Sequence, residues 1–490
     1  MADPAHLLEE LEELISSVVT ESARQSDKWM EWDIRPDFVP SVENLASYLA
    51  LRHHDLRALQ CSLMALGLSS LGRLESRVLP TLQAVRTALA AMLGRTFTLS
   101  DNESEFFSGI EMLASRSLNL FGPHGQHRHT ALMVTCPSEA ADDPAFMLQM
   151  AQHGVEALRI NCAHDDADAW SRMIRHARTA DAKAGRRFAI FMDLAGPKIR
   201  TGDVRELHGK KRLFAGDFIA ITVPGGLDRH FEPEIGLAVE CTMAEPIAAA
   251  RPGHRVFIDD GKIAANIERA DIGSLIAQVT RCKDEGAKLK SEKGINFPDS
   301  QLAIPALTPK DRKDLEFVAV HADAINFSFV QSAGDVALLQ AALAELRPDD
   351  WERLSLILKI ETAHAVSNLP EMVVRAGARQ PVGIMIARGD LAIEIGFTRL
   401  AEMQEEILWV GEAAQVPVIW ATQVLEHLVK EGLPNRGELT DAAMAVRAEC
   451  VMLNKGPYLI EAIEELNRLL DRMDDHIHKK TPQLRRLRSW

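Results

Sequence analysis

The sequence predicts an α/β protein built on a (β/α)8 TIM barrel, with an inserted β-rich lid domain and an N-terminal helical domain. Three observations predict this architecture. Short apolar runs alternate with helical stretches from about residue 130 onward. Polar and charged residues stand at the ends of most of these runs. One connection between two runs is far longer than the others.

The apolar runs have the near-continuous hydrophobicity of strands that are covered on both faces. Because parallel strands alternating with helices close into a barrel, eight such runs predict the (β/α)8 fold. The runs are Ala131–Cys136, Ala157–Ala163, Phe188–Leu194, Ala324–Val330, Leu356–Glu361, Gly383–Asp390, Pro417–Val424 and Cys450–Leu453.

The long connection lies between the third and fourth runs. It contains alternating, strand-like stretches at Phe218–Val223, Arg255–Ile258 and Ile263–Ile267, punctuated by Gly and Pro. We therefore expect residues 203–292 to form a lid, a small β-barrel inserted into the catalytic barrel. The catalytic barrel itself would comprise residues 126–202 and 293–475.

Residues 1–125 have a different hydrophobic pattern from the rest of the chain. His6–Val19 and Leu45–Leu93 place apolar residues at helical spacing, on either side of the proline-rich and charged segment Asp33–Pro40. This pattern predicts a small helical domain that serves either as a partner surface or as a cover for the barrel. A helix over Ile460–Arg472 and a basic, solvated C-terminal tail at 476–490 would end the chain.

Composition excludes several classes of protein. The chain has 55 Lys and Arg against 70 Asp and Glu, a net charge of −15, which argues against a broad nucleic-acid-binding surface. No apolar run approaches the ~18 residues of a membrane span. The 6 cysteines include no CxxC pair and fit a reducing compartment. These features predict a cytoplasmic protein without nucleic-acid or membrane partners.

Candidate functional residues stand where the apolar runs end. In a barrel of this kind the active site forms at the C-terminal ends of the strands, and polar side chains in apolar strands are costly unless they face such a site. The residues at these ends are Arg159, Asn161, Asp193, Ser328, Lys359, Glu361, Arg388, Gly389, Asp390, Thr422 and Gln423.

These residue types indicate phosphoryl transfer. Glu361 and Asp390 offer hard oxygen ligands for Mg2+ or Mn2+. Arg159 and Lys359 bring positive charge for an anionic group, and the backbone at Gly389 can receive an anion if a helix begins there. Metal, Lys and Arg around one cavity are the parts that phosphoryl transfer requires. A plain salt bridge is the alternative for Lys359 and Glu361, which alternation places on one strand face.

Longer segments resemble the pyruvate kinase family, in family order over about two thirds of the chain. They are RINCAH (159–164), FMDLAGPKIRTG (191–202), FIDDGKI (257–263), KGINFPDSQLAIPALTPKDRKDL (293–315), INFSFV (325–330), LKIET (358–362), MIARGDLAIEI (385–395), IWATQVL (419–425) and NRGELTDAAMAV (435–446). The resemblance implies a Mg2+-dependent or Mn2+-dependent kinase that transfers a phosphoryl group from phosphoenolpyruvate to ADP, giving pyruvate and ATP.

The resemblance also implies roles for individual residues. The metal would bind Glu361 and Asp390, and Lys359 would stabilise the phosphoryl group in transit. Thr422 would belong to the relay that protonates enolpyruvate. The remaining residues would contact phosphate groups or the nucleotide: Arg159, Asn161, His164, Arg200 and Ser328.

Two departures from the family pattern change its implications. The family's K+ site corresponds to Asn161, Ala163, Asp193 and Leu194, so two oxygen ligands are missing. Members that work without K+ carry Leu after the Asp and Lys in the GPEIRTG stretch, as this chain does at Leu194 and Lys198. The resemblance therefore implies that K+ is not required and that Lys198 supplies its charge.

The second departure lies after the eighth run. The segment Leu453–Tyr458 is shorter than the family's phosphate-contacting loop, and RKASD has become QSAGD (331–335). We expect no family-type C-terminal domain after the helix at 460–472. Two alternatives therefore stay open beside the kinase, namely a related enzyme with a different acceptor and a catalytically silent homologue. The helical domain is a candidate for a subunit interface in a homo-oligomer. His124, His127 and His129 form either a linker segment or a metal site.

Overall fold

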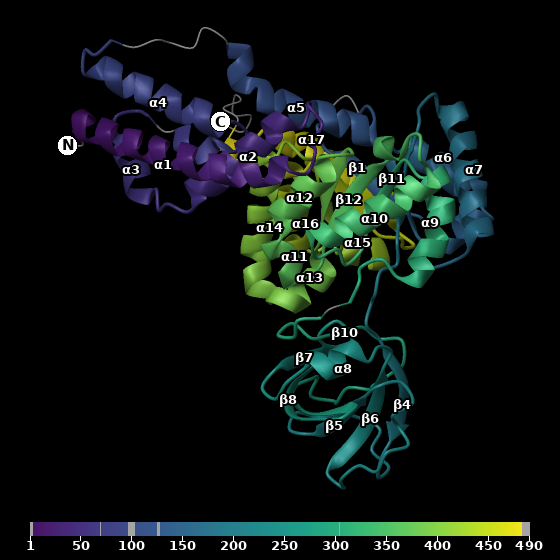
Figure 1. Ribbon diagram of the computed structural model, residues 1–490. Helices are drawn as coiled ribbons and strands as arrows, with labels where there is room; N and C mark the ends of the chain where they lie inside the picture. The colour runs from purple at the N-terminus through teal and green to yellow at the C-terminus, as the bar shows by residue number, and fades with distance from the viewer. Residues whose placement is uncertain (1–2, 69, 97–102, 125–127, 303, 483–490) are drawn as a thin grey trace.

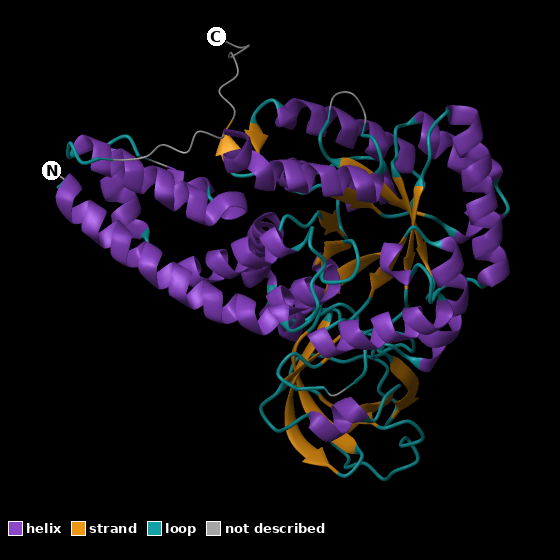
Figure 2. Ribbon diagram, turned by 45° about the horizontal axis from the view of Figure 1, so that its top comes forward, coloured by secondary structure: helices purple, strands orange, loops and turns teal. Residues whose placement is uncertain are grey.

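A computed structural model describes residues 3–68, 70–96, 103–124, 128–302 and 304–482. Figure 1 shows a central barrel with a helical domain at one side and an inserted sheet domain hanging from the other. Figure 2, coloured by secondary structure, shows the helices wrapped around the barrel strands. The (β/α)8 fold class, with its lid and its helical domain, is confirmed.

The central barrel is closed and its strands are all parallel. Around the barrel the order is β1-β15-β14-β13-β12-β11-β3-β2, so neighbours in sequence are neighbours in space. All eight predicted runs form strands. They are β1 (Ala131–Thr135), β2 (Ala157–Asn161), β3 (Ala189–Asp193), β11 (Ala324–Phe327), β12 (Ser355–Ile360), β13 (Val382–Ala387), β14 (Val418–Ala421) and β15 (Cys450–Leu453).

Helices cover the outside of the barrel. Residues at their N-termini favour helix initiation. Thr308 and Asp311 form a capping box at the start of α9, and Asn435 and Glu438 form one at the start of α16. The barrel helices are α6 (Pro144–Gln152), α7 (Ala167–Ala184), α9 (Pro309–His321), α10 (Ala333–Leu346), α11 (Ala363–Ser367), α12 (Leu369–Gly377), α13 (Arg388–Ile395), α14 (Phe397–Ala413), α15 (Glu426–Glu431), α16 (Arg436–Met444) and α17 (Leu459–Asp474). None of the helices in the described ranges combines the length and hydrophobicity needed to cross a bilayer.

All the predicted runs except the last extend one to three residues past the true strand ends, and the sixth and seventh show why. The sixth run stops at Ala387 because Arg388 already begins α13, as the glycine at position 389 suggested. The seventh stops at Ala421 because Thr422 and Gln423 take left-handed backbone angles, with φ of 62° and 57°, which no strand accommodates. In both cases the residues beyond the strand include candidate site residues named from the sequence.

The inserted domain has its own sheet and its own core. Its strands follow the order β10-β7-β8-β9-β5-β6-β4, and its core residues include Ile221, Val239 and Ile267. The strands are β4 (Thr201–Glu206), β5 (Phe218–Thr222), β6 (Ile235–Cys241), β7 (Arg255–Ile258), β8 (Ile263–Asp271), β9 (Ser274–Arg281) and β10 (Ile295–Asn296), with one short helix, α8 (Glu245–Ala249).

The N-terminal helices share one continuous core with the outer helices of the barrel. The end of the fifth helix closes the floor of the barrel, where the Phe121 ring stacks on Phe191 at 5.7 Å between centroids. The apolar stripes that we considered for a partner surface are therefore largely covered by the barrel. The helices are α1 (Pro4–Met30), α2 (Val39–Arg52), α3 (Arg57–Ala65), α4 (Val78–Met92) and α5 (Glu103–Phe121), with short 3-10 turns η1 (Ser70–Arg73) and η2 (Glu75–Arg77).

The expectation of a solvated basic tail is wrong for its first lysines. Residues Ile477–His478 (β16) and Thr481–Pro482 (β17) form a small hairpin against the barrel. Within it, Lys479 pairs with Glu449 and Lys480 pairs with Glu75, because both carboxylates are buried and require a cation. Arg485, Arg486 and Arg488 lie outside the described residues.

Candidate active site

A buried cluster of charges sits at the C-terminal ends of β2, β3 and β12. Asp193 accepts two hydrogen bonds from Arg159, Nε to Oδ1 at 2.9 Å and Nη2 to Oδ2 at 2.7 Å. Asn326 donates to the same carboxylate at 2.6 Å. Burial opposes ionisation of Asp193, but Arg159 and Lys359 outweigh it and lower the pKa of Asp193 to about 2. Asp193 therefore fixes Arg159 in place as a permanently ionised partner.

Lys359 lies in the middle of this cluster with its ammonium group held on three sides. Its Nζ is 2.7 Å from Ser328 Oγ, 3.1 Å from Asp193 Oδ2 and 3.1 Å from Glu361 Oε1. Burial favours the neutral amine, yet Glu361 and Asp193 outweigh it and raise the pKa of Lys359. The salt bridge left open by the sequence is thus present, and it holds the Lys359 ammonium in a fixed position.

The second candidate metal ligand, Asp390, lies close to the first. Burial raises the pKa of Glu361 despite the nearby Lys359 ammonium, and the charge of Asp390 raises it further. The Phe329 backbone N–H donates to Glu361 Oε2 at 2.5 Å. Lys198 Nζ contacts both Asp390 oxygens, at 2.9 and 3.1 Å. Two adjacent carboxylates that repel one another fit a divalent cation.

The protein offers few side-chain ligands for a metal ion at this site. Within the described ranges, no group of three or more His, Cys, Asp or Glu side chains is arranged to hold a metal. A cation bound to Glu361 and Asp390 would therefore take its remaining ligands from substrate and water, which is how Mg2+ is usually held beside phosphate groups. His124 and His129 form no such group, and His127 lies outside the described residues.

A strained turn follows β14 and faces the start of α13. Thr422 has φ of 62°, an unusual angle for a β-branched residue. Arg388 holds this turn by donating to the carbonyl oxygens of Ala421 at 3.0 Å and Thr422 at 2.6 Å, and it also pairs with Asp441. The Gly389 N–H donates to Thr422 Oγ at 2.8 Å. The hydroxyl of Thr422 is thereby oriented with its own hydrogen free to donate.

A cavity of about 670 Å3 opens between the barrel mouth and the strands that lead to the lid. Its walls include Lys198, Asp390 and Phe329 from the barrel side and Asn296 from the lid side. Asn296 also donates a 2.9 Å hydrogen bond to Glu394 of α13. Of the charged groups described above, Lys198 and Asp390 line this space, which is large enough for a small substrate.

Other residues named from the sequence are not part of this cluster. Asn161 Oδ1 accepts from the N–H of Ala163 at 3.0 Å, and the His164 side chain is exposed. Arg200 lies where the chain enters the lid and donates to the carbonyl oxygen of Glu292 at 3.2 Å. The structure thus gathers Arg159, Ser328, Lys359, Glu361 and Asp390 at the mouth, with Lys198 beside them, and Gly389 and Thr422 at the turn.

The sequence analysis missed two polar partners of the cluster. Asn326 holds Asp193, and Thr135 accepts from Arg159 Nη1 at 3.1 Å. Strand alternation offered a signal for the first, since Asn326 stands two residues before Ser328 and so shares its face. Arg388 was named as a strand-end residue, but its support of the Thr422 turn depends on contacts that sequence does not reveal.

Fold and site together define a class: a (β/α)8-barrel enzyme with fixed cations and two metal-type carboxylates at the C-terminal ends of its strands. Comparison with known proteins gives the family. Residues 127–463 match the family described as "Pyruvate kinase, barrel domain". The chain belongs to the pyruvate kinase family, and it is an enzyme of pyruvate kinase type.

Comparison with individual proteins gives the same family. A pyruvate kinase of Methylorubrum extorquens is 32% identical over 71% of this chain and 69% of its own length, and one of Corynebacterium efficiens is 33% identical over 67% and 65%. A crystal structure of a pyruvate kinase from Cryptosporidium parvum superposes with a TM-score of 0.64 at 25% identity, covering 74% of this chain and 73% of that one. The chain thus spans about two thirds of its relatives' length.

Proposed function

We propose that the chain transfers a phosphoryl group from phosphoenolpyruvate to ADP, with Mg2+ or Mn2+ on Glu361 and Asp390 and without a requirement for K+. The observation that carries the proposal is the Lys359 ammonium, held by Ser328, Asp193 and Glu361 beside the two carboxylates. A preorganised cation at this point stabilises the negative charge of a phosphoryl group as it moves between two oxygens.

Arg159 and Lys359 have complementary roles in this proposal. The Arg159 guanidinium is fixed by Asp193 and Thr135, so it contacts a phosphate group without losing side-chain freedom on binding. Lys359 contacts the phosphoryl group in transit. A divalent cation on Glu361 and Asp390, when bound, neutralises charge on the substrate oxygens.

Thr422 supplies the proton path that the reaction also needs. Loss of the phosphoryl group leaves enolpyruvate, whose methylene carbon must receive a proton to become pyruvate. Because the Gly389 N–H occupies a lone pair of Thr422 Oγ, the hydroxyl hydrogen points away from that bond. The proposal places this hydroxyl in the relay to the carbon, with a water molecule to resupply it. Strain in the Thr422 backbone supports a functional role.

The lid completes the site by excluding water, so that ADP rather than water accepts the phosphoryl group. We place the remaining phosphate and nucleotide contacts at Asn161, His164 and Arg200, on the family resemblance. Arg200 lies at the base of the lid, where closure would bring it toward the cavity.

Independence from K+ follows from two positions. The Leu194 side chain is fully buried and has no oxygen, and Asp193 is already bound by Arg159, Lys359 and Asn326. The Lys198 ammonium lies on Asp390 and brings a fixed positive charge to the same mouth. Strong activation by K+ in a tetramethylammonium buffer would contradict this part of the proposal.

A second candidate function, the same donor with a different acceptor, is favoured by the short segment after β15. There Gly456 packs against Val429, and the Tyr458 N–H donates to the Val429 carbonyl oxygen at 3.1 Å. The segment is thus tied to α15, and its basic residue for a nucleotide phosphate is the exposed Lys455.

One assay separates these functions: pyruvate formation from phosphoenolpyruvate with Mg2+ in K+-free buffer, with and without ADP. Turnover that requires ADP supports the kinase. Pyruvate formation without ADP identifies water as the acceptor, which is one form of the second candidate. If neither occurs while Mg2+-dependent binding of phosphoenolpyruvate persists by calorimetry, the acceptor is a different molecule.

We further propose a cytoplasmic location and a homo-oligomeric assembly. The cysteines are unpaired, in keeping with a reducing compartment. Two large apolar side chains, Phe397 and Leu433, are 65% and 70% exposed near the start of α14 and between α15 and α16. Light scattering on the intact chain tests the assembly: a mass of 54.2 kDa would contradict it.

A further inference from the structure

The turn between β14 and α15 contains three residues in the left-handed region of backbone conformation. They are Thr422, Gln423 and Leu425, with φ of 62°, 57° and 47°. Residues other than glycine rarely adopt such angles, and they persist there only where the surrounding structure holds them. Thr422 is the residue that the proposed function places in the proton relay. The groups that hold this turn therefore decide where its hydroxyl lies.

The start of the turn is held by Arg388. Its guanidinium donates through Nε to the Ala421 carbonyl oxygen at 3.0 Å and through Nη2 to the Thr422 carbonyl oxygen at 2.6 Å. The third nitrogen, Nη1, donates to Asp441 Oδ1 of α16. In the described part of the chain, Asp441 is the one carboxylate that pairs with Arg388. Asp441 thus neutralises the guanidinium and fixes its orientation.

The end of the turn is held by Glu438, also of α16. The His427 backbone N–H, in the first turn of α15, donates to Glu438 Oε1 at 2.5 Å. N–H groups in the first turn of a helix have no partner within that helix, so Glu438 satisfies one of them. Glu438 also closes the capping box of its own helix with Asn435, which fixes its side chain.

Glu438 and Asp441 share one face of α16, because residues three apart on a helix are neighbours. This face therefore holds the strained turn from both sides, through Arg388 before it and through His427 after it. The hydroxyl of Thr422 lies between these two points.

We propose that Asp441 and Glu438 are positioning residues for the proton-transfer step, which hold Thr422 Oγ within reach of the carbon that receives the proton. The inference rests on the proposed function, because it assigns no chemistry of its own to either carboxylate. Neither residue lines the cavity at the barrel mouth, and each acts through a neighbour. Since a misplacement of about 1 Å lowers a rate by ~10²-fold, loss of this support should slow proton transfer.

Deuterium exchange into pyruvate isolates this step from phosphoryl transfer. In the reverse of the protonation, a methyl C–H bond of pyruvate breaks and its proton passes to the relay. The electron pair forms the C=C bond of the enolate, and the carbonyl oxygen takes the negative charge. Return of a deuteron from D2O labels the methyl group, which nuclear magnetic resonance detects. The assay uses the intact chain with Mg2+, and with inorganic phosphate to fill the phosphoryl position.

Asp441→Asn removes the charge and keeps the shape of the side chain. We expect it to slow the exchange by ~10–100-fold, while the affinity for phosphoenolpyruvate, measured by calorimetry, stays unchanged. Glu438→Ala should also slow the exchange, and Glu438→Gln, which keeps an oxygen for the His427 N–H, should restore most of it. Exchange at the parent rate in Asp441→Asn or in Glu438→Ala would overturn the role of the residue replaced.

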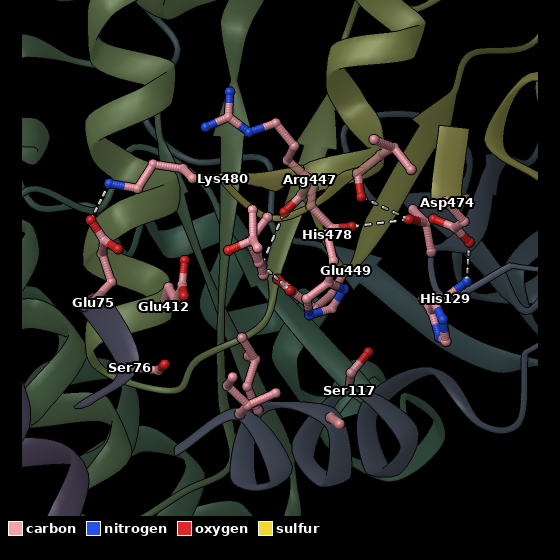
Figure 3. A pocket seen from close by; sticks show the side chains of 18 of the residues that line it. Glu75, Ser76, Ser117, His129, Glu412, Arg447, Glu449, Asp474, His478 and Lys480 are labelled. Atoms are coloured by element: carbon pink, nitrogen blue, oxygen red, sulfur yellow. Dashed lines mark hydrogen bonds and ion pairs between the residues drawn. The ribbon is translucent and has the colours of Figure 1, made fainter. Parts of the chain in front are cut away.

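The Arg447–Glu405 ion pair supplies a matched control. Its side chains are 11% and 20% exposed, against 7% and 28% for Arg388 and Asp441. Arg447 lies at the opposite end of the barrel, in a cavity beside Glu449, the residue directly before β15 (Figure 3). Glu405→Gln should therefore leave the exchange unchanged. A loss as large as that of Asp441→Asn would overturn the specific role of Asp441.

A double substitution shows whether Asp441 acts through Thr422. Added to Thr422→Ala, Asp441→Asn should slow the exchange no further, because the hydroxyl that it positions is already absent. Equal losses in the parent chain and in Thr422→Ala would overturn the proposal.

Amide hydrogen exchange, read by mass spectrometry, tests the support of the turn without catalysis. Residues 421–427 should lose protection in Asp441→Asn and keep it in Glu405→Gln. Unchanged protection in Asp441→Asn would contradict the support by α16, whereas a parent chain that leaves pyruvate unlabelled would contradict the proposed function. The two failures are thereby distinguished.

Discussion

The backbone N–H of Gly389, in the first turn of α13, donates a 2.8 Å hydrogen bond to the hydroxyl of Thr422 at the end of β14. This bond joins two neighbouring strand ends across the barrel mouth. It also links the backbone next to Asp390, a candidate metal ligand, to Thr422, whose backbone conformation is strained. The strain of a β-branched residue at φ 62° is maintained by Arg388, which binds the two carbonyl oxygens of the turn.

Replacing Thr422 should therefore separate activity from stability. We expect Thr422→Ala to lower kcat by ~10²–10³-fold, since a positioned proton-transfer group contributes ~10²–10⁴-fold. Its thermal midpoint should change little, because the loss of the hydrogen bond from the Gly389 N–H is offset by relief of the strain of a β-branched residue at φ 62°. Thr422→Ser keeps the hydroxyl and should keep most of the activity. A serine variant as inactive as the alanine variant would remove the hydroxyl from the reaction.

Lys359 and Glu361 touch one another, yet their substitutions should differ. Lys359→Met should lower kcat by ~10²–10⁴-fold, through loss of charge stabilisation, while Mn2+ binding is retained. Glu361→Gln should weaken Mn2+ binding and nearly abolish turnover. Electron paramagnetic resonance of bound Mn2+, beside the coupled assay, distinguishes them. Near-normal activity in both would show that the site has been misplaced.

Much of this site was predictable because barrel geometry converts sequence position into spatial position. Each strand end falls at the same rim, so Arg159, Lys359, Glu361 and Asp390 were expected together without any long-range information. The partner of Lys198 was not predictable in this way. The sequence suggested that its charge replaces K+, and the structure shows that its ammonium contacts Asp390. This contact depends on side-chain packing in three dimensions, which the sequence does not reveal.

In the N-terminal region, too, some features were predictable from the sequence and others were not. Helical periodicity indicated helices within residues 6–19 and 45–93 but not α5, and periodicity does not say what covers an apolar stripe. The answer depends on long-range contacts such as Arg35 Nε to the Gly377 carbonyl oxygen at 2.9 Å and Asn44 to the Ala413 carbonyl oxygen at 2.7 Å. Likewise, Lys479 and Lys480 looked like surface charges because their acidic partners are distant in sequence.

The Lys198–Asp390 ion pair makes a prediction about metal affinity. The ammonium occupies both oxygens of a proposed metal ligand, so a divalent cation must displace it. We expect Lys198→Met to tighten Mn2+ binding to the substrate-free protein by ~2–5-fold, which corresponds to the free energy of a partly exposed ion pair, and to lower kcat. Lys262→Met, which removes a comparable pair with Asp259 in the lid, should change neither. Weaker Mn2+ binding in Lys198→Met would contradict the competition.

Glu394 predicts a pH dependence of stability. Burial raises the pKa of Glu394 to about 7 from its ordinary 4.5, although Asn296 donates a hydrogen bond to it. The unfolded chain loses this proton near pH 4.5 and the folded chain near 7, so the unfolded state binds fewer protons in between. Stability should therefore fall as pH rises through that window, by about 1–3 kcal/mol from this group.

Glu394→Gln removes this titration and preserves the contact with Asn296. The variant should therefore gain thermal stability relative to the parent chain at pH 8 more than at pH 5. Measuring the difference between the two proteins at each pH cancels the other titrating groups. A difference that is constant from pH 5 to pH 8 would show that Glu394 ionises normally in the folded state.

Phe121 ties the helical domain to the barrel floor and gives the last prediction. Its ring is 1% exposed and stacks on Phe191 inside the barrel, so truncation leaves a cavity where the strands begin. We expect Phe121→Ala to cost ~3–5 kcal/mol of unfolding free energy. Val19→Ala, at a 46% exposed position of α1, should cost little. If Phe121→Ala unfolds at the urea concentration of the parent chain, α5 is not part of the barrel's cooperative unit and the N-terminal helices are an independent domain.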